Sequence, residues 1–327
     1  KFIDMYAGRL RNQVSFMLSA CNFYMPIFEE ALDAYGLPLE LKYLPIIESA
    51  LNPSAVSRAG ASGLWQFMIG TGKIYGLESN SLIDERRDPI KATWAAARYL
   101  KEMYDIYGDW NLVIAAYNCG PGTINKAIRR ANGETDYWKI YNYLPKETRG
   151  YVPAFIAANY VMTYYCDHNI CPMETNIPAS TDTVQVNKNL HFEQIADLCN
   201  VPLDQIKSLN PQYKKHMIPG DSKPYTLRLP IDAISTFIDK QDTIYAHRAD
   251  ELFRNRKTVA VKEITPSTRK TTAAVAGKGK LTYYTIKSGD TLSTIAGKYG
   301  VTIKDIQRWN GMSNTKIAAG KRLKIYK

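Results

Sequence analysis

The sequence has 327 residues, a mass of 37.0 kDa and a formal charge of +11, because 42 Lys and Arg residues outnumber 31 Asp and Glu residues. Its 45% hydrophobic, 11% aromatic and 22% charged residues exclude a globally disordered chain and are sufficient for packed cores. The length suggests two or three domains rather than one.

The sequence predicts no membrane-spanning helix and no metal site. Its longest stretch without a charged residue, 150–166, is short for a bilayer and is interrupted by proline and polar side chains. The chain starts at Lys1 without the basic and apolar segments of an export signal, which leaves the compartment open. The five cysteines lack zinc-site spacing, and Cys166 and Cys171 are close enough in sequence to form a disulfide in an oxidising compartment.

Residues 1 to about 172 have the pattern of an all-α domain. Apolar residues recur three and four apart, as at Trp94, Ala97 and Leu100, and breakers such as Gly70 divide the pattern into short helices. This part also holds 16 of the 23 tyrosines and four of the five tryptophans. Such side chains suit the flat faces of sugars, although packing explains most of them.

Glu48 is the first candidate for catalysis. Leu41, Leu44 and Glu48 are spaced to share one helical face, so the carboxyl group is expected among apolar side chains. A carboxyl group there keeps its proton to a higher pH than a surface Glu, as a general acid near neutral pH requires. Taken alone, a helix-end Glu that reaches solvent or pairs with an arginine is the more frequent arrangement.

Further candidates lie beside turns or helix ends: Gln66 with the Gly63 turn, Tyr117, Asn118 and Tyr151. Gln66 stands between two aromatic residues, where its amide can face a ligand. Tyr117 and Asn118 immediately precede a Gly-containing break, where the approach of a ligand to the backbone is unhindered. Taken singly, each of these residues is explained as well by capping or by core packing.

The second half contains an internal repeat with a constant offset of 100 residues. Residues 186–210 match residues 286–310 at seven positions, among them Asn210 with Asn310. Each copy is predicted to be a βααβ unit. In the second copy, the predicted strands and helices are 283–286, 291–299, 302–309 and 322–326.

A basic segment separates the two copies. Residues 240–280 carry ten Lys and Arg against four Asp and Glu, and the part from 265 onward is rich in Thr, Ala, Gly and Lys, which predicts a flexible linker. Because this charge lies in a linker and not on a folded face, we expect no nucleic-acid partner, whereas a polyanionic surface would attract the tether. The predicted parts are 1–172 (helical domain), 183–230 (degenerate module), 231–280 (basic connecting segment and linker) and 281–327 (second module).

Four motifs in one order resemble the family 1 lytic transglycosylases, whose catalytic domain has a goose-type-lysozyme-like fold. They are Glu-Ser at 48–49, Gly-Leu-Trp-Gln at 63–66, Ala-Tyr-Asn-x-Gly at 116–120 and Glu-Thr-Arg-x-Tyr-Val at 147–152. The two βααβ units resemble LysM modules. The resemblance implies an all-α lysozyme-like catalytic domain followed by two small α+β modules. The implied enzyme needs no cofactor and cleaves the β-1,4 bond between N-acetylmuramic acid and N-acetylglucosamine, leaving 1,6-anhydromuramyl ends.

The same resemblance assigns roles to single residues. It implies Glu48 as the sole catalytic acid and base, and it implies contacts to the substrate by Ser49, Gly63, Gln66, Tyr117, Asn118 and Tyr151. Two residues depart from the family pattern, and both are expected near the cleft: Trp65 and Cys119.

In the second module, the resemblance implies a glycan groove between the turn after the first strand and the loop after Asn310. The implied glycan-binding residues are Gly289, Asp290, Thr291 and Asn310. The first module has Lys188 to His191 in place of the turn motif, so it is expected to keep the fold, while sugar binding by it is doubtful.

The motifs supply a single catalytic carboxylate, because Asp84, Glu85 and Asp88 lie among arginines and are predicted to form structural ion pairs. One carboxylate is enough if the C6 hydroxyl of the muramyl residue is the nucleophile. Two alternatives stay open: a hydrolytic muramidase that uses Glu48 with a downstream acid, and a non-catalytic adaptor that binds peptidoglycan.

The expected partners are the glycan strands of peptidoglycan, and we expect the protein to be a monomer. A peptidoglycan substrate places it in the periplasm or cell envelope. The family is often anchored to the outer membrane by an N-terminal lipid, but no lipobox cysteine stands at the start of this chain, so membrane association remains open.

Overall fold

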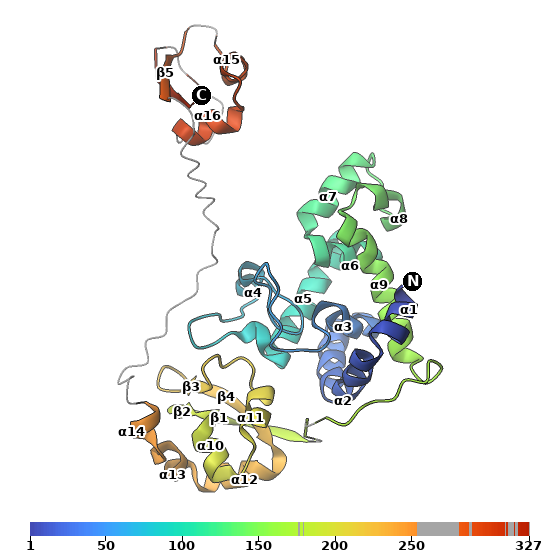
Figure 1. The fold of residues 1–327 in the computed structure, drawn as a ribbon, viewed down its shortest axis with the longest axis vertical. Helices are drawn as coiled ribbons and strands as arrows, with labels where there is room; N and C mark the ends of the chain where they lie inside the picture. The colour runs from blue at the N-terminus through green and yellow to red at the C-terminus, as the bar shows by residue number, and fades with distance from the viewer. Residues whose placement is uncertain are drawn as a thin grey trace. The chain divides into compact units, whose positions relative to one another are not determined.

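The computed structural model of the protein describes residues 1–175, 177–178, 180–253, 281–287, 290–310, 312, 317 and 320–326 (Figure 1). The chain divides into two compact units, Lys1–Pro266 and Ser267–Lys327. The predicted linker at 265–280 and the predicted turn residue Gly289 lie outside the described residues.

The first unit begins with a helical domain, as the sequence predicts. Its helices are α1 (Phe2–Asp4), η1 (Met5–Arg9), α2 (Arg11–Ala34), η2 (Leu39–Tyr43), α3 (Leu44–Ser49), α4 (Ile69–Ile74), η3 (Glu85–Arg87), α5 (Pro89–Tyr107), α6 (Trp110–Cys119), α7 (Pro121–Arg130), α8 (Tyr137–Ile140), η4 (Tyr141–Tyr143) and α9 (Lys146–Thr163). Two expectations are wrong in detail, since α2 runs for 24 residues and Gly70 lies inside α4 instead of ending a helix. One glycine costs a helix only about 1 kcal/mol, which packing can offset.

Local signals fix the ends of the two helices behind the candidate site. The carboxylate of Asp88 accepts hydrogen bonds from the backbone N–H groups of Ile90 and Lys91 at the start of α5, and that helix ends at Gly108, whose φ is 62°. Helix α6 ends before Gly120, whose φ of 83° favours glycine. Tyr117 and Asn118 therefore lie in the last turn of α6.

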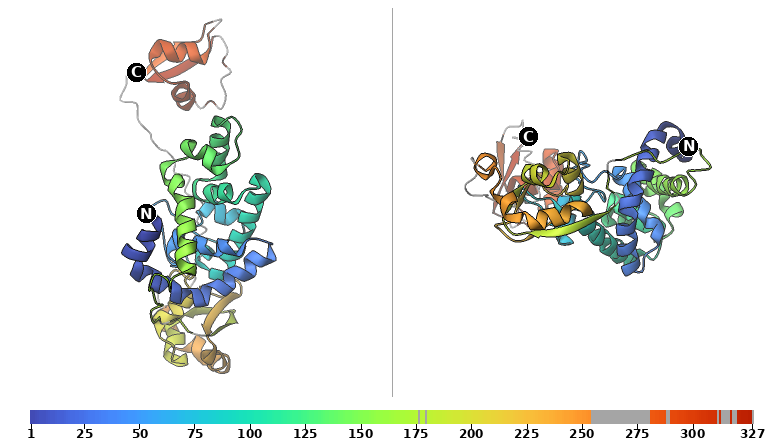
Figure 2. Two further views of the ribbon diagram at one scale, coloured as in Figure 1. Left: turned by 90° about the vertical axis from the view of Figure 1, so that its right-hand side faces the viewer. Right: turned by 90° about the horizontal axis from the view of Figure 1, so that it is seen from below.

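Packing brings α9 against the part of the domain that carries Glu48. Helix α9 contacts α1, α3 and α6, and it runs along the helical domain in Figure 2, where it is drawn in light green. Trp65, expected near the cleft, is fully buried; its ring meets Phe28 edge-on, and its Nε1–H donates to Oγ1 of Thr93 over 2.9 Å. The Trp65 side chain therefore packs in the core, which supplies both an apolar contact and a partner for the indole N–H.

The first module follows in the same unit. Its elements are β1 (Thr181–Val186), β2 (Asn189–His191), α10 (Phe192–Cys199), α11 (Leu203–Leu209), β3 (Met217–Pro219), β4 (Tyr225–Pro230), α12 (Ile231–Asp239), α13 (Gln241–Ala246) and α14 (Ala249–Leu252). Strand β1 pairs antiparallel with β4, and β2 with β3. Residues 231–252, expected in a connecting segment, form helices, because Phe237 and Ile244 are buried in the core of this module.

The second module has the predicted order of elements and a core of its own. Its elements are β5 (Leu281–Thr285), α15 (Leu292–Tyr299), α16 (Ile303–Asn310) and β6 (Arg322–Tyr326), and β5 pairs antiparallel with β6.

One hydrogen-bond network recurs in both modules. The Asn210 amide donates to the carbonyl oxygens of Ile206 and Arg228, and it accepts from the Arg228 N–H. Asn310 makes the same three bonds in the second module, to the carbonyl oxygens of Ile306 and Lys324 and from the Lys324 N–H. The network ties the second helix of each module to its last strand, which confirms that one fold is used twice.

No helix among the described residues combines the length and the apolar character needed to cross a bilayer. Cys166 and Cys171, for which the sequence allows a disulfide, are exposed free thiols.

Gly63 provides a test of the close packing near Glu48. A Cβ at this position would stand 1.7 Å from the carbonyl oxygen of Arg86, whereas Gly60 has the same φ of +89° with nothing within 4 Å. We expect Gly63→Ala to lower the free energy of unfolding by more than about 3 kcal/mol or to prevent folding, and Gly60→Ala to cost about 1–2 kcal/mol from backbone strain alone. Urea unfolding of both variants measures the difference, and equal losses would contradict the close approach.

Candidate active site

Glu48 stands at the end of a short helix between two irregular segments. Helix α3 follows the 3₁₀ helix η2 and stops because Ala50 and Leu51 adopt left-handed φ angles of 51° and 57°. Leu41 and Leu44, predicted to share a face with Glu48, are both buried, although the junction of η2 and α3 separates them. The carboxyl group therefore lies in the last turn of α3 against an apolar core.

Burial and one tyrosine determine the protonation of Glu48. The pKa of Glu48 is raised from 4.5 to about 7, chiefly by burial and to a lesser extent by the nearby Glu147 carboxylate. The Tyr151 phenol, from α9, donates a hydrogen bond to Oε1 of Glu48, and this bond opposes the increase because it favours the charged form. The carboxyl group can therefore give up and regain a proton near neutral pH.

Ser49, the last residue of α3, and Gln66 both hydrogen-bond to the loop region that follows this helix. The Ser49 hydroxyl donates to the carbonyl oxygen of Leu64 over 2.9 Å. The Gln66 amide donates to the carbonyl oxygens of Gly63 and Ala55 over 2.8 and 3.3 Å, and Gln66 itself has a positive φ of 49°. These bonds hold the loop in a tight conformation beside the Glu48 carboxyl group.

Tyr117 and Asn118 attach the end of α6 to the same region. The Tyr117 hydroxyl donates to the carbonyl oxygen of Trp65 over 2.6 Å, and burial, followed by the charge of Glu48, raises the pKa of Tyr117. Oδ1 of Asn118 accepts from the Thr148 hydroxyl over 2.8 Å. Asn118 thus joins α6 to α9 at Thr148, one residue after Glu147 and three before Tyr151.

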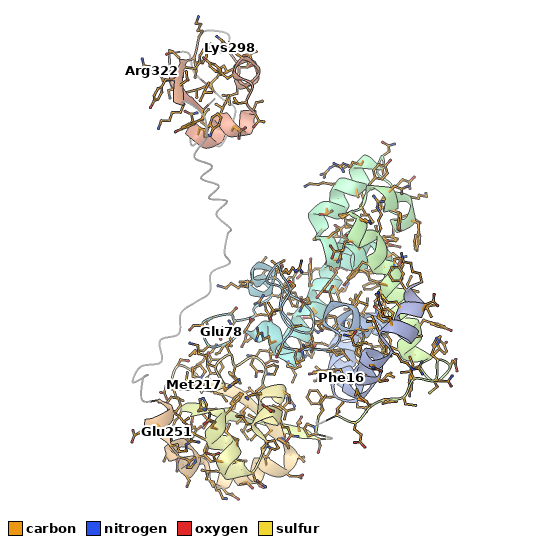
Figure 3. The ribbon with its side chains drawn as sticks, in the orientation of Figure 1. Phe16, Glu78, Met217, Glu251, Lys298 and Arg322 are labelled. Carbon is orange, nitrogen blue, oxygen red and sulfur yellow. The ribbon has the colours of Figure 1, made fainter. Side chains whose placement is uncertain are left out.

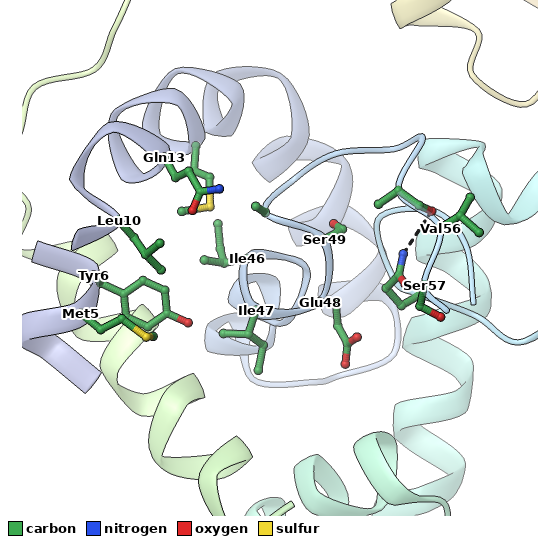
Figure 4. Close-up of a pocket in the computed structure, with 14 residues that line it drawn as sticks. Met5, Tyr6, Leu10, Gln13, Ile46, Ile47, Glu48, Ser49, Val56 and Ser57 are labelled. Carbon is green, nitrogen blue, oxygen red and sulfur yellow. Dashed lines mark hydrogen bonds between the residues drawn. The ribbon is translucent and has the colours of Figure 1, made fainter. Parts of the chain in front are cut away.

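A pocket of about 490 Å³ opens beside Glu48. Figure 4 shows Glu48 between Tyr6 and Ile47 on one side and Val56 and Ser57 on the other. Among the described residues that line this pocket, Glu48 is the single carboxylate.

The structure brings some of the predicted site residues into the pocket and leaves others outside its lining. Glu48, Ser49 and Gln66 line the pocket, whereas Gly63 is buried and packed against the backbone of Arg86. Tyr117 and Tyr151 interact directly with Glu48 through charge or hydrogen bonding. Cys119, expected near the cleft, is partly buried, and burial raises the pKa of its thiol.

Sequence reasoning missed several residues of this site. The lining residues of the N-terminal segment are Met5, Tyr6, Leu10 and Gln13, which no recognisable motif marks. Glu147 and Thr148 act on Glu48 and Asn118. Both belong to the Glu-Thr-Arg-x-Tyr-Val motif at 147–152, and membership of this motif could have marked them as site residues.

The acids predicted to form ion pairs are structural. Asp84 is 2% exposed and binds Arg86 through two hydrogen bonds of 2.8 Å. Glu85 pairs with Lys91, and Asp88 caps α5. The prediction is confirmed for Asp84 and Glu85, while Asp88 has the role of a helix cap.

In the second module, the predicted glycan-binding side chains hold the local fold. Oδ2 of Asp290 accepts from the Tyr284 hydroxyl and from the Lys287 N–H over 2.7 and 2.8 Å. Thr291 caps α15, and Asn310 makes the network described above. A role of these residues in glycan binding remains a prediction.

Comparisons with known families give three matches along the chain. Residues 25–140 match the transglycosylase SLT domain, residues 180–246 match the LysM-like domain of lytic transglycosylase MltD, and residues 284–325 match the LysM domain. The predicted resemblances to transglycosylases and LysM modules are thereby confirmed. The second match also includes α12 and α13, in agreement with the folded module.

Two of three similar proteins are named as lytic murein transglycosylases. The chain is 33% identical over 294 residues to membrane-bound lytic murein transglycosylase D of Escherichia coli K12, which covers 89% of this chain and 60% of that protein. It is 33% identical over 124 residues to the soluble lytic murein transglycosylase of the same strain, which covers 36% of this chain and 19% of the relative. A putative tributyltin chloride resistance protein of Alteromonas is 36% identical over 123 residues, covering 37% of this chain and 59% of the relative. The chain thus spans about 60% of the length of the Escherichia coli membrane-bound relative.

The raised pKa of Glu48 has a consequence for stability. The folded protein holds this proton up to about pH 7 and the unfolded chain only to about pH 4.5, so the free energy of unfolding falls as the pH rises through this range and stays lower above it. We expect Glu48→Gln to raise the free energy of unfolding by up to about 3 kcal/mol near pH 8 and by little near pH 4. Urea unfolding at both pH values measures this, with exposed Glu40→Gln as the control. A pH-independent effect of Glu48→Gln would contradict the raised pKa.

Proposed function

Because this chain combines a transglycosylase SLT domain with two LysM-type domains, we propose that it is a lytic transglycosylase that cleaves the glycan strands of peptidoglycan. The observation that carries the proposal is Glu48, a carboxyl group with a pKa of about 7 in a pocket whose described lining contains no second carboxylate. Its substrate bond is the β-1,4 linkage between N-acetylmuramic acid and N-acetylglucosamine.

In the proposed mechanism, protonated Glu48 donates its proton to the glycosidic oxygen, the C1–O bond breaks, and the muramyl ring acquires oxocarbenium character. The Glu48 carboxylate then removes the proton from the C6 hydroxyl group of the same residue, and O6 bonds to C1. The product is a 1,6-anhydromuramyl end, and no water is consumed. The Tyr151 hydroxyl stabilises the carboxylate between the two proton transfers, since its hydrogen bond favours the charged form.

A hydrolytic muramidase would need a second carboxylate to activate water. The downstream acids do not support this role, because Asp84 and Glu85 are paired with cations and Asp88 caps a helix. The sugar site is proposed to be shaped by Ser49, Gln66, Tyr117 and Asn118. The first three donate hydrogen bonds to backbone carbonyl oxygens of the loop beside Glu48.

We infer that the second module binds glycan and keeps the enzyme on its substrate, which raises the effective concentration of cleavable bonds. The site of action is then the cell envelope. The relative from Escherichia coli is named as membrane-bound, and for this chain we propose a periplasmic enzyme that acts as a monomer.

The mass of the products tests the proposed reaction. Purified peptidoglycan treated with the protein is expected to give ends that are lighter by one water than hydrolysed ends, because the C6 hydroxyl group replaces water as the nucleophile. Glu48→Gln is expected to abolish release while retaining binding to the glycan, since the amide cannot donate or accept the catalytic proton. Reducing ends alone would indicate a muramidase, and undiminished lysis by Glu48→Gln would exclude Glu48 as the acid.

The pH profile tests the role of Tyr151. Tyr151→Phe removes the hydrogen bond that lowers the pKa of Glu48, so that pKa should rise above about 7 and the alkaline limb of kcat/KM should move to higher pH. Loss of a charge-assisted hydrogen bond of about 1.5 kcal/mol predicts a fall in kcat of about tenfold. Tyr160→Phe, an exposed position on the same helix, is the control. An alkaline limb that stays in place or moves to lower pH would contradict the assignment.

A further inference from the structure

The helical domain and the first module share a contact surface that the proposed function does not require. Leu82 and Ile83 belong to the helical domain by sequence, yet they are 3% and 0% exposed and form part of the hydrophobic core of the first module. Burial of two large apolar side chains contributes several kcal/mol to the attachment. The two parts are therefore joined by a shared core as well as by the chain between them.

Backbone hydrogen bonds attach one loop of the module to the same segment. This loop follows Asn210, and its counterpart in the second module is the loop that the LysM resemblance assigns to the glycan groove. The Asp84 N–H donates to the carbonyl oxygen of Gln212 over 2.9 Å, and the Lys214 N–H donates to that of Leu82 over 2.7 Å. In the first module, the loop that would face sugar is thus already bound to the helical domain.

Side chains strengthen this attachment. The Lys214 ammonium group donates to the carbonyl oxygen of Asn80 over 2.8 Å and lies 3.9 Å from Oδ2 of the buried Asp84. At the edge of the surface, the Lys223 ammonium group pairs with Glu78 over 2.7 Å. Glu78 is labelled in Figure 3.

The contact continues to the active site through one buried arginine. Asp84 binds Arg86 through two hydrogen bonds. One terminal nitrogen of Arg86 donates to the carbonyl oxygens of Gly60 and Phe67 over 2.8 and 2.9 Å. These two residues stand at the two ends of loop 60–67.

Loop 60–67 contains the groups that order the site. Its Leu64 carbonyl oxygen accepts from Ser49, and its Trp65 carbonyl oxygen accepts from Tyr117. Gln66, which lines the pocket, also belongs to this loop. A displacement of Asp84 would therefore reach the wall of the pocket through a single side chain, without passing through Tyr151 and Glu48.

We propose that the first module binds the helical domain of its own chain through the loop at 212–214, and that it positions the pocket wall at loop 60–67 instead of holding glycan. Lys214 is the positioning residue of this surface, since its ammonium group contacts both the Asn80 carbonyl oxygen and the Asp84 carboxylate. The inference rests on the proposed function only where it predicts kinetics.

Steady-state kinetics on peptidoglycan with Lys214→Met tests the effect on the site. We expect KM to rise about fivefold with kcat within a factor of about two, because a displaced wall weakens binding of the sugar while Glu48 and Tyr151 keep their geometry. Lys215→Met, an exposed neighbouring lysine, should change neither constant, and Lys214→Arg should restore most of the loss. A lower kcat at unchanged KM would mean only fewer folded molecules and would overturn the positioning role.

Hydrogen exchange of the full chain tests the same proposal without any activity. Lys214→Met should accelerate amide exchange in loop 60–67, and Lys215→Met should not. Addition of a chitin oligosaccharide to the unaltered protein should leave exchange at 210–216 unchanged. New protection of 210–216 by the sugar, or unchanged exchange of loop 60–67 in Lys214→Met, would overturn the proposal. If instead the protein failed to release anhydro products, this measurement would still stand.

Discussion

The arrangement of the site depends on the removal of water from one carboxyl group. Glu48 loses hydration because α3 ends against the core, and the pKa of Glu48 rises to about 7 as a result. The Tyr151 hydroxyl limits this rise by stabilising the charged form. The two effects together give a group that can act as an acid and then as a base at one pH, which a reaction with a single carboxylate requires. The unfavourable burial of this group also lowers the stability of the folded state above neutral pH.

A second constraint keeps the loop beside Glu48 in place. Gly63 has no room for a side chain against the Arg86 carbonyl group, and Arg86 holds both ends of the loop while its charge is balanced by Asp84. A buried ion pair gives little net stability, but breaking it leaves an uncompensated charge in the interior. The pair therefore enforces one geometry of the loop. In the proposed scheme, the first module maintains that geometry through Asp84.

The two copies of the βααβ fold show how one architecture can serve two purposes. Asn210 and Asn310 make the same network in both, so the internal framework is equivalent. The difference lies in the surface, because the loop after Asn210 is occupied by residues 80–84 of the helical domain. Glycan binding is accordingly proposed for the second module, and attachment to the helical domain for the first.

The sequence by itself determined the elements whose signals are local or periodic. The helical domain, the place of Glu48 at a helix end and the ion pairs of Asp84 and Glu85 follow from spacing, charge and repetition. So does the βααβ order of the second module and of β1, α10, α11 and β4 in the first, to which the first module adds β2, β3 and three helices. The burial of Trp65, the contact of Tyr151 with Glu48 and the contribution of the N-terminal segment to the pocket were decided only by tertiary structure. Glu48 and Tyr151 are 103 residues apart, and α12 belongs to the first module because Phe237 is buried in the core of that module. Such contacts depend on which helix faces which, and no pattern within one segment specifies the side chains that another segment brings to it.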